Sequence, residues 1–465
     1  MLGLNTISIA ALACILTACA QAADRPPPPP TADLPWYQAT LTVGGEPQQR
    51  FAGFGFSMTQ DGPYGELDEE DRAEVDRLLF AGLDARILRL WYGPGDTEAV
   101  HEAYQANGLI DHALAGGVRE LLLGPWSYRR DPEAHARTIA EDIRTLRERY
   151  GIEITATGVV NEPEGNPEDR KYMPESDYVP LAIAMRRELE ALGLSGVIVL
   201  GPEFASADGV AIDWFDVVAG DSEALASFDA LGTHSYNMAA RPELAERTLA
   251  HGKQYWMTEA GGGITDGSAE FAYTFATSAG ARFLNDLNNG VTHWVWFIGL
   301  GDGTDDVRQK LVMCEGPCAG TPRIYKNYAY HYLQQIAASF PPGTTMRHVT
   351  SDLPEWRDMV YTYGPKPPIN AAAGLRPDGR WALAVVNQTL GTGWEQARWD
   401  DPANYRIAFQ VPELAGTGSR VFDLCRTNAK VAVRCGESVE VTDGRIDLDL
   451  VSLELVTLVA RNPAP

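Results

Sequence analysis

The sequence is poor in basic residues, and this scarcity limits the partners that the protein can have. Its 465 residues include 38 Lys and Arg against 63 Asp and Glu, which gives a formal net charge of -25. Such a charge repels phosphate backbones and anionic lipid surfaces. We therefore expect no nucleic-acid partner, although acidity alone does not identify an activity.

Cysteine is also scarce, with six residues in the whole chain. Two of them lie in an N-terminal apolar segment, and the other four form two close pairs, Cys314 with Cys318 and Cys425 with Cys435. Neither pair lies beside a second cysteine pair or a histidine cluster, so a metal site is not favoured. In an exported protein, the two pairs predict two local disulfides.

The apolar run Leu2 to Ala18 is too short to span a bilayer as a durable helix, and it is typical of a targeting segment. It ends in Leu16 to Cys19, which resembles a bacterial lipobox and predicts lipidation of Cys19. No Lys or Arg precedes the run, which departs from that pattern. Simple secretion and a chance match therefore remain as alternatives.

A run of five prolines, Pro26 to Pro30, follows the targeting segment. Such a run favours an extended polyproline spacer of roughly 3.1 Å per residue. We expect a signal peptide with a lipobox over 1–19 and a Pro-rich tether over 20–35. The protein should then be exported to the bacterial periplasm, or held by a lipid anchor at the outer membrane or the cell surface.

Short apolar strands alternate with longer amphipathic helices from Phe51 onward. Eight strands are predicted to end near Gly55, Arg89, Trp126, Glu162, Glu203, His234, Glu259 and Trp296. A repeat of roughly 30 residues over eight units is typical of a (β/α)8 TIM barrel. We place this α/β barrel at 51–343.

The remaining elements complete the predicted architecture. Helices are expected at 68–80, 132–150, 177–192 and 269–287, and a further helix near 325–340 closes the barrel. Gly82, Gly151 and Gly193 follow the first three helices and are predicted to cap them in the left-handed conformation. Strand-like pieces between turn residues predict a β-sandwich at 344–465, joined by an early strand at 36–50.

Two glutamates stand at strand ends that should meet at one mouth of the barrel. Glu162 ends the fourth strand and Glu259 ends the seventh, and the C-terminal strand ends form the active sites of such barrels. Paired carboxylates that flank a bond are the machinery of glycoside hydrolysis, with one protonated and one ionised. Glu203 ends the fifth strand and is a reserve candidate.

Three polar residues at neighbouring strand ends can tune these carboxylates. Arg89 can hold a carboxylate ionised, with a structural ion pair as the alternative. Tyr236 can donate its hydroxyl to the same carboxylate, with simple packing as the alternative. His234 alone is as easily structural as functional, and its place at a strand end is what makes it a candidate.

Tryptophans recur at the same level of the barrel. Ring faces stack on the C–H faces of sugars and line pockets in general. We expect Trp126 and Trp296 to line the site. The alternation in His293 to Phe297 leaves open whether Trp294 or Phe297 takes the place of Trp296.

Taken together, these motifs resemble the large (β/α)8 clan of retaining glycosidases, and most of all glycoside hydrolase family 30. The matching segments are Gly53 to Thr59, Gly124 to Ser127, Val160 to Pro163, His234 to Tyr236 and Thr258 to Ala260. The resemblance implies that Glu162 is the general acid/base, that Glu259 is the nucleophile and that Asn161 binds the sugar 2-hydroxyl. It also implies retention, carboxyl groups about 5 to 5.5 Å apart and no cofactor.

Two departures from the family pattern leave the substrate open. Gln60 stands where the family commonly has an Asp, and Asp61 comes one place later. Arg129 and Arg130 stand where a proline and a second tryptophan are usual, and they either recognise an acidic substituent or are solvated. We expect a poly- or oligosaccharide substrate. Another clan enzyme for arabinose- or galactose-type units and a non-catalytic surface glycan-binding lipoprotein are the alternatives.

Overall fold

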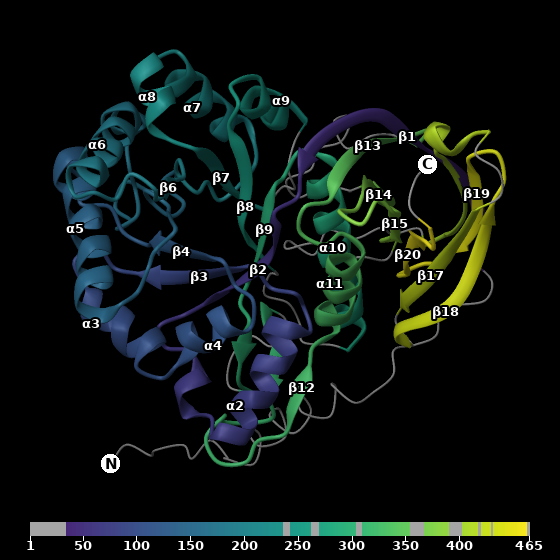
Figure 1. The fold of residues 1–465 in the computed structure, drawn as a ribbon, viewed down its shortest axis with the longest axis horizontal. Helices are drawn as coiled ribbons and strands as arrows, with labels where there is room; N and C mark the ends of the chain where they lie inside the picture. Colours follow the sequence, from purple (N-terminus) through teal and green to yellow (C-terminus); the bar gives the residue numbers. More distant parts are fainter. Residues whose placement is uncertain are drawn as a thin grey trace, which may run out of the picture.

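The computed structural model describes residues 34–235, 242–261, 269–303, 309–353, 367–389, 402–416, 420–428 and 431–462. Cys19 and Tyr236 lie outside these ranges, as does most of the segment predicted to be a tether. A barrel of strands and helices forms one side of the molecule, and a large β-sheet lies beside it (Figure 1). None of the helices in the described ranges is long and apolar enough to cross a membrane.

Eight parallel strands form the barrel, as the sequence predicts. They are β2 Gly53–Met58, β3 Ile87–Tyr92, β4 Glu120–Pro125, β5 Ala156–Thr157, β6 Ile198–Val199, β7 Ala230–His234, β8 Gln254–Ala260 and β9 His293–Phe297. Their order in the sheet is β6-β5-β4-β3-β2-β9-β8-β7. A parallel bridge between Leu200 and Ala230 joins the two edges and closes the barrel.

Apolar side chains fill the inside of the barrel and also its outer face. The interior cluster consists of Ile87, Leu122, Ala156, Leu200, Ala230, Trp256 and Val295. Because successive side chains of a strand point to opposite faces, the residues next to these point outward to the helices. Both faces of each strand are therefore buried, and Arg89, two residues after Ile87, lies beyond this apolar layer toward the C-terminal strand ends.

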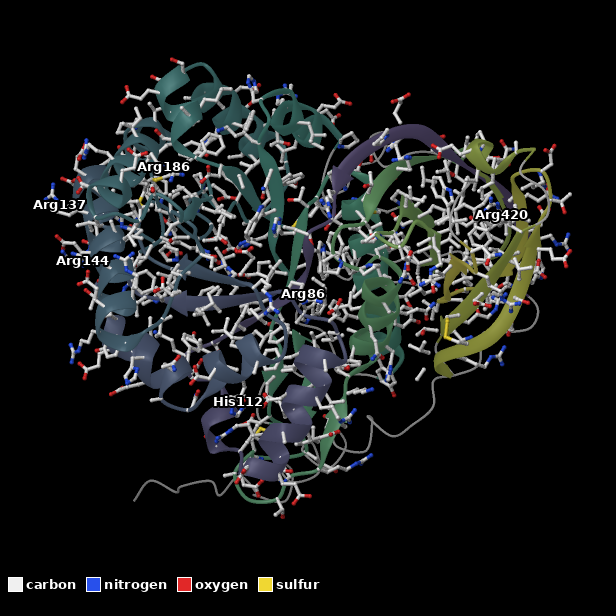
Figure 2. The ribbon with its side chains drawn as sticks, viewed as in Figure 1. Arg86, His112, Arg137, Arg144, Arg186 and Arg420 are labelled. Carbon is white, nitrogen blue, oxygen red and sulfur yellow. A yellow bond between two sulfur atoms is a disulfide. The ribbon has the colours of Figure 1, made fainter. Side chains whose placement is uncertain are left out.

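The helices lie around the barrel. They are α2 Glu69–Asp76, α3 Thr97–Val100, α4 Leu109–Ala115, α5 Pro132–Tyr150, α6 Tyr178–Ala191, α7 Gly209–Ala219, α8 Ser222–Ser227, α9 Pro242–Ala250, α10 Ala269–Asn288 and α11 Tyr328–Ser339. In α5, Ile139, Ile143 and Leu146 face the barrel, and Arg137 lies on the outer face (Figure 2). The Asp131 side chain caps the N-terminus of this helix, and Gly151 ends it with φ 71°.

Gly82 corrects one prediction, because it does not form a left-handed cap. Its φ is -68°, and the helical segment before it ends in a π-turn at Arg77–Ala81. A Cβ at Gly82 would lie 2.3 Å from the hydroxyl oxygen of Tyr330 on α11. The glycine is therefore required by the close approach of α11 and not by its backbone angle.

The second sheet is β-rich and encloses its own hydrophobic core. Its nine strands are β1 Trp36–Arg50, β13 Thr345–Ser351, β14 Ile369–Leu375, β15 Trp381–Asn387, β16 Asn404–Gln410, β17 Arg420–Asn428, β18 Val431–Val441, β19 Arg445–Leu450 and β20 Leu455–Ala460. Each contributes a buried side chain to one core cluster, so the sheet curls around that core. β1 pairs antiparallel with β13 and parallel with β16.

The two predicted disulfides are present. Cys425 and Cys435 link β17 to β18 in the large sheet. Cys314 and Cys318 form a second bridge beside a small sheet made of β10 Leu300–Gly301, β11 Val312–Cys314 and β12 Ile324–Lys326. Both bridges close short loops, with sequence separations of 10 and 4 residues.

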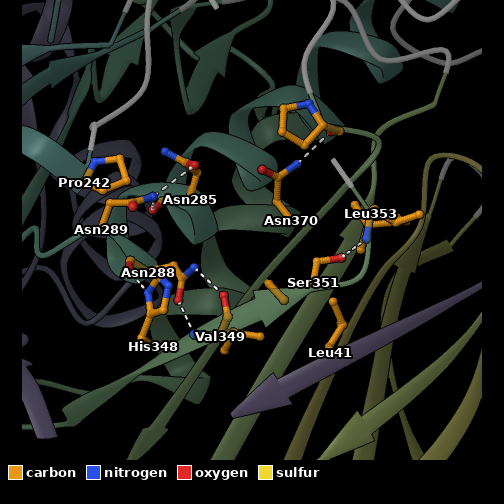
Figure 3. A pocket seen from close by; sticks show the side chains of 13 residues that line it. Leu41, Pro242, Asn285, Asn288, Asn289, His348, Val349, Ser351, Leu353 and Asn370 are labelled. Carbon is orange, nitrogen blue, oxygen red and sulfur yellow. Dashed lines mark hydrogen bonds between the residues drawn. The ribbon is translucent and has the colours of Figure 1, made fainter. Parts of the chain in front are cut away.

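The last two helices connect the barrel to the large sheet. On α11, the Gln335 side chain donates to the carbonyl oxygen of Cys425 at 2.9 Å, and the Tyr332 hydroxyl donates to that of Leu453 at 2.7 Å. On α10, the Asn288 amide donates to the carbonyl oxygen of Val349 at 2.9 Å. A small cavity of about 60 Å³ lies beside this last contact, between α10 and the sheet (Figure 3).

The close approach of β2 and β3 yields a first prediction. A Cβ at Gly55 would lie 2.3 Å from the carbonyl oxygen of Ile87, which is backbone and cannot give way. We expect Gly55→Ala to destabilise the protein by about 1–3 kcal/mol or more. Gly196→Ala is the control, because its Cβ meets no atom within 4 Å. Thermal unfolding midpoints measure both, and an unchanged midpoint for Gly55→Ala would contradict the packing described here.

Candidate active site

Arg89 on β3 is the centre of the site. Its side chain is fully buried and points into the mouth of the barrel, two residues after Ile87, which points into the interior. One Nη donates to Glu259 Oε2 at 2.5 Å, the other donates to Asn161 Oδ1 at 2.8 Å, and Nε donates to Glu203 Oε1 at 3.2 Å. A buried guanidinium needs such partners to offset its lost hydration.

The backbone at Asn161 and Glu162 leaves the regular barrel to place both side chains in the mouth. The strand β5 ends at Thr157, and a bridge pairs Asn161 with Glu203 beyond the end of the sheet. Glu162 has φ 45°, a left-handed conformation that is uncommon for residues other than glycine. Its backbone N–H donates to the carbonyl oxygen of Glu203 at 2.7 Å, and this bond holds the strained turn.

His234, the last residue of β7, lies between the two candidate catalytic carboxylates. Its Nδ1 is 2.9 Å from Glu162 Oε1, and its Nε2 is 4.0 Å from Glu259 Oε2. Burial acts to lower the pKa of His234, but the charge of Glu259 and the hydrogen bond to Glu162 outweigh it and raise that pKa. The two carboxylates therefore favour the protonated form of His234.

Lys171 was not predicted from the sequence, and it contacts Glu162 directly. Its Nζ donates to Glu162 Oε2 from the irregular segment that follows the strained turn. Burial acts to raise the pKa of Glu162, but the hydrogen bonds and charges of His234 and Lys171 lower it well below its usual range. Nothing in the local sequence marks this lysine, because the segment has no periodic pattern.

A cavity of about 620 Å³ opens next to these residues. It is lined by residues from four strand ends and from the segment after Glu162, namely Thr59, Gln60, Asp61, Trp91, Trp126, Asn161, Glu162, Asp169, Arg170 and Lys171. Trp91 packs over the Arg89 guanidinium, with 5.0 Å from Cζ to the ring centroid. Trp126 lies in the lining, and the cavity is large enough for a sugar unit.

Trp296 does not line the cavity, so that prediction is wrong. Its side chain is fully buried, and its Nε1 donates to the carbonyl oxygen of Gln309 at 2.6 Å. Trp294 and Trp296 both lie on the outer face of β9 and pack against aromatic residues of α10, whereas Val295 faces the barrel interior. Phe297 is the aromatic residue of this strand nearest the mouth, 5.6 Å from Trp91 between ring centroids.

Arg129 and Arg130 are not placed to recognise a substrate either. The Arg129 guanidinium donates to the carbonyl oxygen of Pro94 at 3.1 Å, and that of Arg130 donates to the carbonyl oxygen of Pro167 at 2.7 Å. Neither residue lines the cavity. Their side chains brace neighbouring loops, and the cations on the cavity wall are Arg170 and Lys171.

Glu203, the reserve candidate, is a partner of Arg89 and not a member of the facing pair. Its side chain is fully buried against Gly158 and Gly232. A Cβ at Gly158 would lie 2.2 Å from Glu203 Oε2, so position 158, directly after β5, requires a glycine while Glu203 stays in place. Tyr236, predicted to contact the same site, lies outside the described residues.

Within the described ranges, Glu162, His234 and Glu259 form the one group of three side chains with metal-ligand chemistry close enough to share an ion. One ligand atom from each lies within 4.8 Å of the others. However, the Glu259 carboxylate already accepts from Arg89, and the two oxygens of Glu162 already face the Lys171 ammonium group and the His234 imidazole. Positive charge at this site is therefore supplied by protein side chains.

The fold is that of a (β/α)8 barrel with a β-rich side domain, and the solved structures that share it include several glycoside hydrolases. No family model matches the chain, and no curated protein matches it in sequence. All three structures cited below are less than 25% identical to the chain. The similarity therefore supports the family-30 resemblance at the level of the fold.

The catalytic domain of GH30 xylanase C from Talaromyces cellulolyticus is 14% identical, with a TM-score of 0.67 over 91% of this chain and 100% of that one. An endo-β1,6-glucanase is 16% identical, with a TM-score of 0.62 over 90% and 94% of the two chains. The GH51 arabinofuranosidase from Xanthomonas axonopodis pv. citri is 13% identical, with a TM-score of 0.61 over 91% and 100%.

Glu164, two residues after Glu162, yields a prediction on pH-dependent stability. Its Oε1 accepts from the Ala205 backbone N–H at 2.6 Å, and burial raises the pKa of its carboxyl group to about 7. A folded-state pKa above the unfolded one gives stabilisation that is present at low pH and lost as pH rises through about 7. We expect Glu164→Gln, which stays neutral, to exceed the wild type in stability at pH 8 by up to about 3 kcal/mol.

At about pH 4, where the wild-type carboxyl is protonated in both states, Glu164→Gln and the wild type should unfold at similar temperatures. Glu168→Gln is the matched control, because Glu168 lies exposed in the same segment. Thermal unfolding between about pH 4 and pH 8 measures these differences. A Glu164→Gln advantage that does not grow with pH would contradict the assignment.

Proposed function

We propose that the protein is a retaining β-glycoside hydrolase that cleaves a poly- or oligosaccharide by double displacement. The observation that carries this proposal is the facing of Glu162 and Glu259 across the barrel mouth, with an oxygen of each within 4.8 Å. Retaining enzymes place their carboxyl groups about 5–5.5 Å apart, and inverting enzymes about 6.5–9.5 Å apart. The short separation therefore favours retention.

Glu259 is the nucleophile in this proposal. Its carboxylate is fixed by the 2.5 Å bond from Arg89 and carries negative charge toward the sugar. Attack on the anomeric carbon breaks the glycosidic bond and forms a covalent glycosyl-enzyme. Asn161 is oriented by the same guanidinium through its Oδ1, which leaves its amide N–H groups to bind the 2-hydroxyl of the sugar.

Glu162 is the acid/base. It donates a proton to the oxygen of the leaving sugar in the first step and removes a proton from the attacking water in the second. Trp91 and Trp126 supply ring faces for the sugar next to it. These two carboxylates complete both half-reactions, so the proposal needs no metal or organic cofactor.

The sugar is the open part of this proposal, because the fold is shared by a xylanase, an endo-β1,6-glucanase and an arabinofuranosidase. A non-catalytic glycan-binding protein of the same fold is the other candidate. Binding alone needs aromatic faces and hydrogen-bond donors, and it does not require two carboxylates at this separation. The carboxylate pair therefore favours the enzyme.

Azide rescue tests both glutamates on an aryl β-glycoside chosen from a broad panel of aryl glycosides and polysaccharides. We expect Glu259→Ala and Glu162→Ala each to lose about 10⁴-fold or more of kcat on a polysaccharide. Azide should then give a glycosyl azide of inverted configuration with Glu259→Ala, because it replaces the missing nucleophile. With Glu162→Ala it should give the retained configuration, because it attacks the glycosyl-enzyme.

NMR of the isolated azide products distinguishes the two configurations. If Glu259→Ala gave the retained azide and Glu162→Ala gave the inverted one, the roles assigned to the two glutamates would be reversed. Wild-type protein that binds a glycan of the panel and hydrolyses none would support the binding protein instead. Glu168→Gln serves as the control, since its exposed carboxylate lies outside the cavity lining.

We also propose that Cys19 is lipidated after removal of the segment before it. The Leu16 to Cys19 motif and the proline run that follows it support a tethered enzyme, and the two disulfides are consistent with an exported protein. In a bacterial host, labelled palmitate should be incorporated into the wild type and not into Cys19→Ser. Equal labelling of the two proteins would refute the anchor.

A further inference from the structure

Both oxygens of the candidate acid/base are held by basic side chains at once. Glu162 Oε1 faces His234 Nδ1, and Glu162 Oε2 accepts from Lys171 Nζ. A general acid must carry a proton on one of these oxygens and present it to the glycosidic oxygen. The ammonium group of Lys171 stabilises the ionised carboxylate instead, so this arrangement opposes the first step of the proposed reaction.

Lys171 is the partner that a substrate can displace. Four titratable groups face Glu162, which are His234 on β7, Glu259 on β8, and Glu164 and Lys171 on the segment that follows Glu162. The His234 side chain is fully buried, whereas that of Lys171 is 30% exposed and forms part of the cavity wall. A ligand in the cavity therefore reaches Lys171 first.

A second cation stands beside it. Arg170 is exposed and lines the same cavity, and its carbonyl oxygen is held by the Tyr128 backbone N–H at 2.8 Å. In the part of the chain that the structure describes, no carboxylate lies within 4.0 Å of its guanidinium. Arg170 and Lys171 are thus two adjacent cations on a wall that also carries the carboxylates of Asp61, Glu162 and Asp169. Asp169 accepts from the Lys171 backbone N–H at 3.2 Å, so its Oδ1 is already engaged in this segment.

We propose that Arg170 and Lys171 bind an anionic substituent of the substrate, a carboxylate or a sulfate, and that this binding frees Glu162 to take up its proton. The proposal rests on the acid/base role given to Glu162 above. The ammonium group of Lys171 moves from Glu162 to the anion, and Arg170 supplies further donors to the same anion. Loss of one neighbouring cation raises the pKa of Glu162 toward the range that a general acid needs.

The inference names a class of substrate. The sugar next to the scissile bond carries a uronic-acid carboxylate or a sulfate ester, because Lys171 can reach only groups close to the acid/base. A neutral sugar would leave the Lys171–Glu162 pair intact and would be hydrolysed slowly. Lys171 is therefore a positioning residue that links recognition of the substituent to protonation of Glu162.

The test compares wild type, Lys171→Met and Lys171→Arg on a pair of substrates. One is the acidic polysaccharide of the panel that is hydrolysed fastest, and the other is the same polymer after reduction of its carboxyl groups. A sulfated polymer and its desulfated form make a second pair, which distinguishes the two anions. We expect the wild type to prefer one charged form by at least about tenfold in kcat/KM. Lys171→Met should lose this preference, with faster turnover of the neutral form, and Lys171→Arg should retain part of it.

The pH profile separates this role from simple support of the fold. The alkaline limb of kcat reports the pKa of the acid in the enzyme–substrate complex. In the wild type it should lie at higher pH with the charged polymer than with the neutral one, and in Lys171→Met the two limbs should coincide. Arg137→Met is the control, because it removes one positive charge from the outer face of α5 (Figure 2).

Other outcomes are also decisive. Wild-type enzyme that hydrolyses charged and neutral forms equally, or Lys171→Met that slows both equally, would overturn the proposal and leave the two-glutamate mechanism standing. If the wild type hydrolyses no polymer, the proposed two-glutamate mechanism fails. Binding of the same polymers in affinity gels then tests the anion site separately from the mechanism. Tighter binding of the charged polymer by the wild type, lost in Lys171→Met, would support the anion site. Equal binding of the charged and neutral polymers by the wild type would overturn it.

Discussion

The buried guanidinium of Arg89 is the interaction on which the whole mouth of the barrel depends. It donates to Asn161 and Glu203, which lie beyond the ends of β5 and β6, and to Glu259, which lies near the end of β8. Each of these groups would be costly to bury alone, and removing one partner of a buried pair typically costs about 3–5 kcal/mol. Arg89 therefore fixes the relative positions of four strand ends. Its bond to Glu259 also orients the carboxylate of the candidate nucleophile.

The short strands β5 and β6 explain how the chain delivers these groups. Each forms only two residues of regular sheet, so the chain beyond them is free to bend toward the barrel axis. The bridge between Asn161 and Glu203 and the left-handed turn at Glu162 replace the regular ladder there. Backbone strain at Glu162 is tolerated because the surrounding bonds overdetermine the turn.

Much of this architecture could be predicted from the sequence, because period and strand ends are local signals. The eight apolar runs predict the barrel, and Glu162 and Glu259 stand out because a charge ends each run. Trp296 was misplaced because both faces of a barrel strand are apolar, so alternation does not tell the mouth from the helix layer. Gly82 was misjudged because its constraint comes from Tyr330, which is 248 positions further along the chain. Lys171 lies in a segment without periodicity, where only the folded structure shows what its ammonium group contacts.

The charges that hold the site together also limit its chemistry. The carboxylates of Glu162, Glu203 and Glu259 meet the cations of Arg89 and Lys171 and the imidazole of His234. This balance of charges and hydrogen bonds stabilises a buried polar cluster. A proton on Glu162 disturbs that balance, because it leaves the cations with one negative charge fewer. In the proposed mechanism an anionic ligand restores the lost charge, and Lys171 is the cation of the cluster that is both partly exposed and on the cavity wall. The requirement for stability in the free protein and the requirement for acid catalysis thus meet at the same side chain.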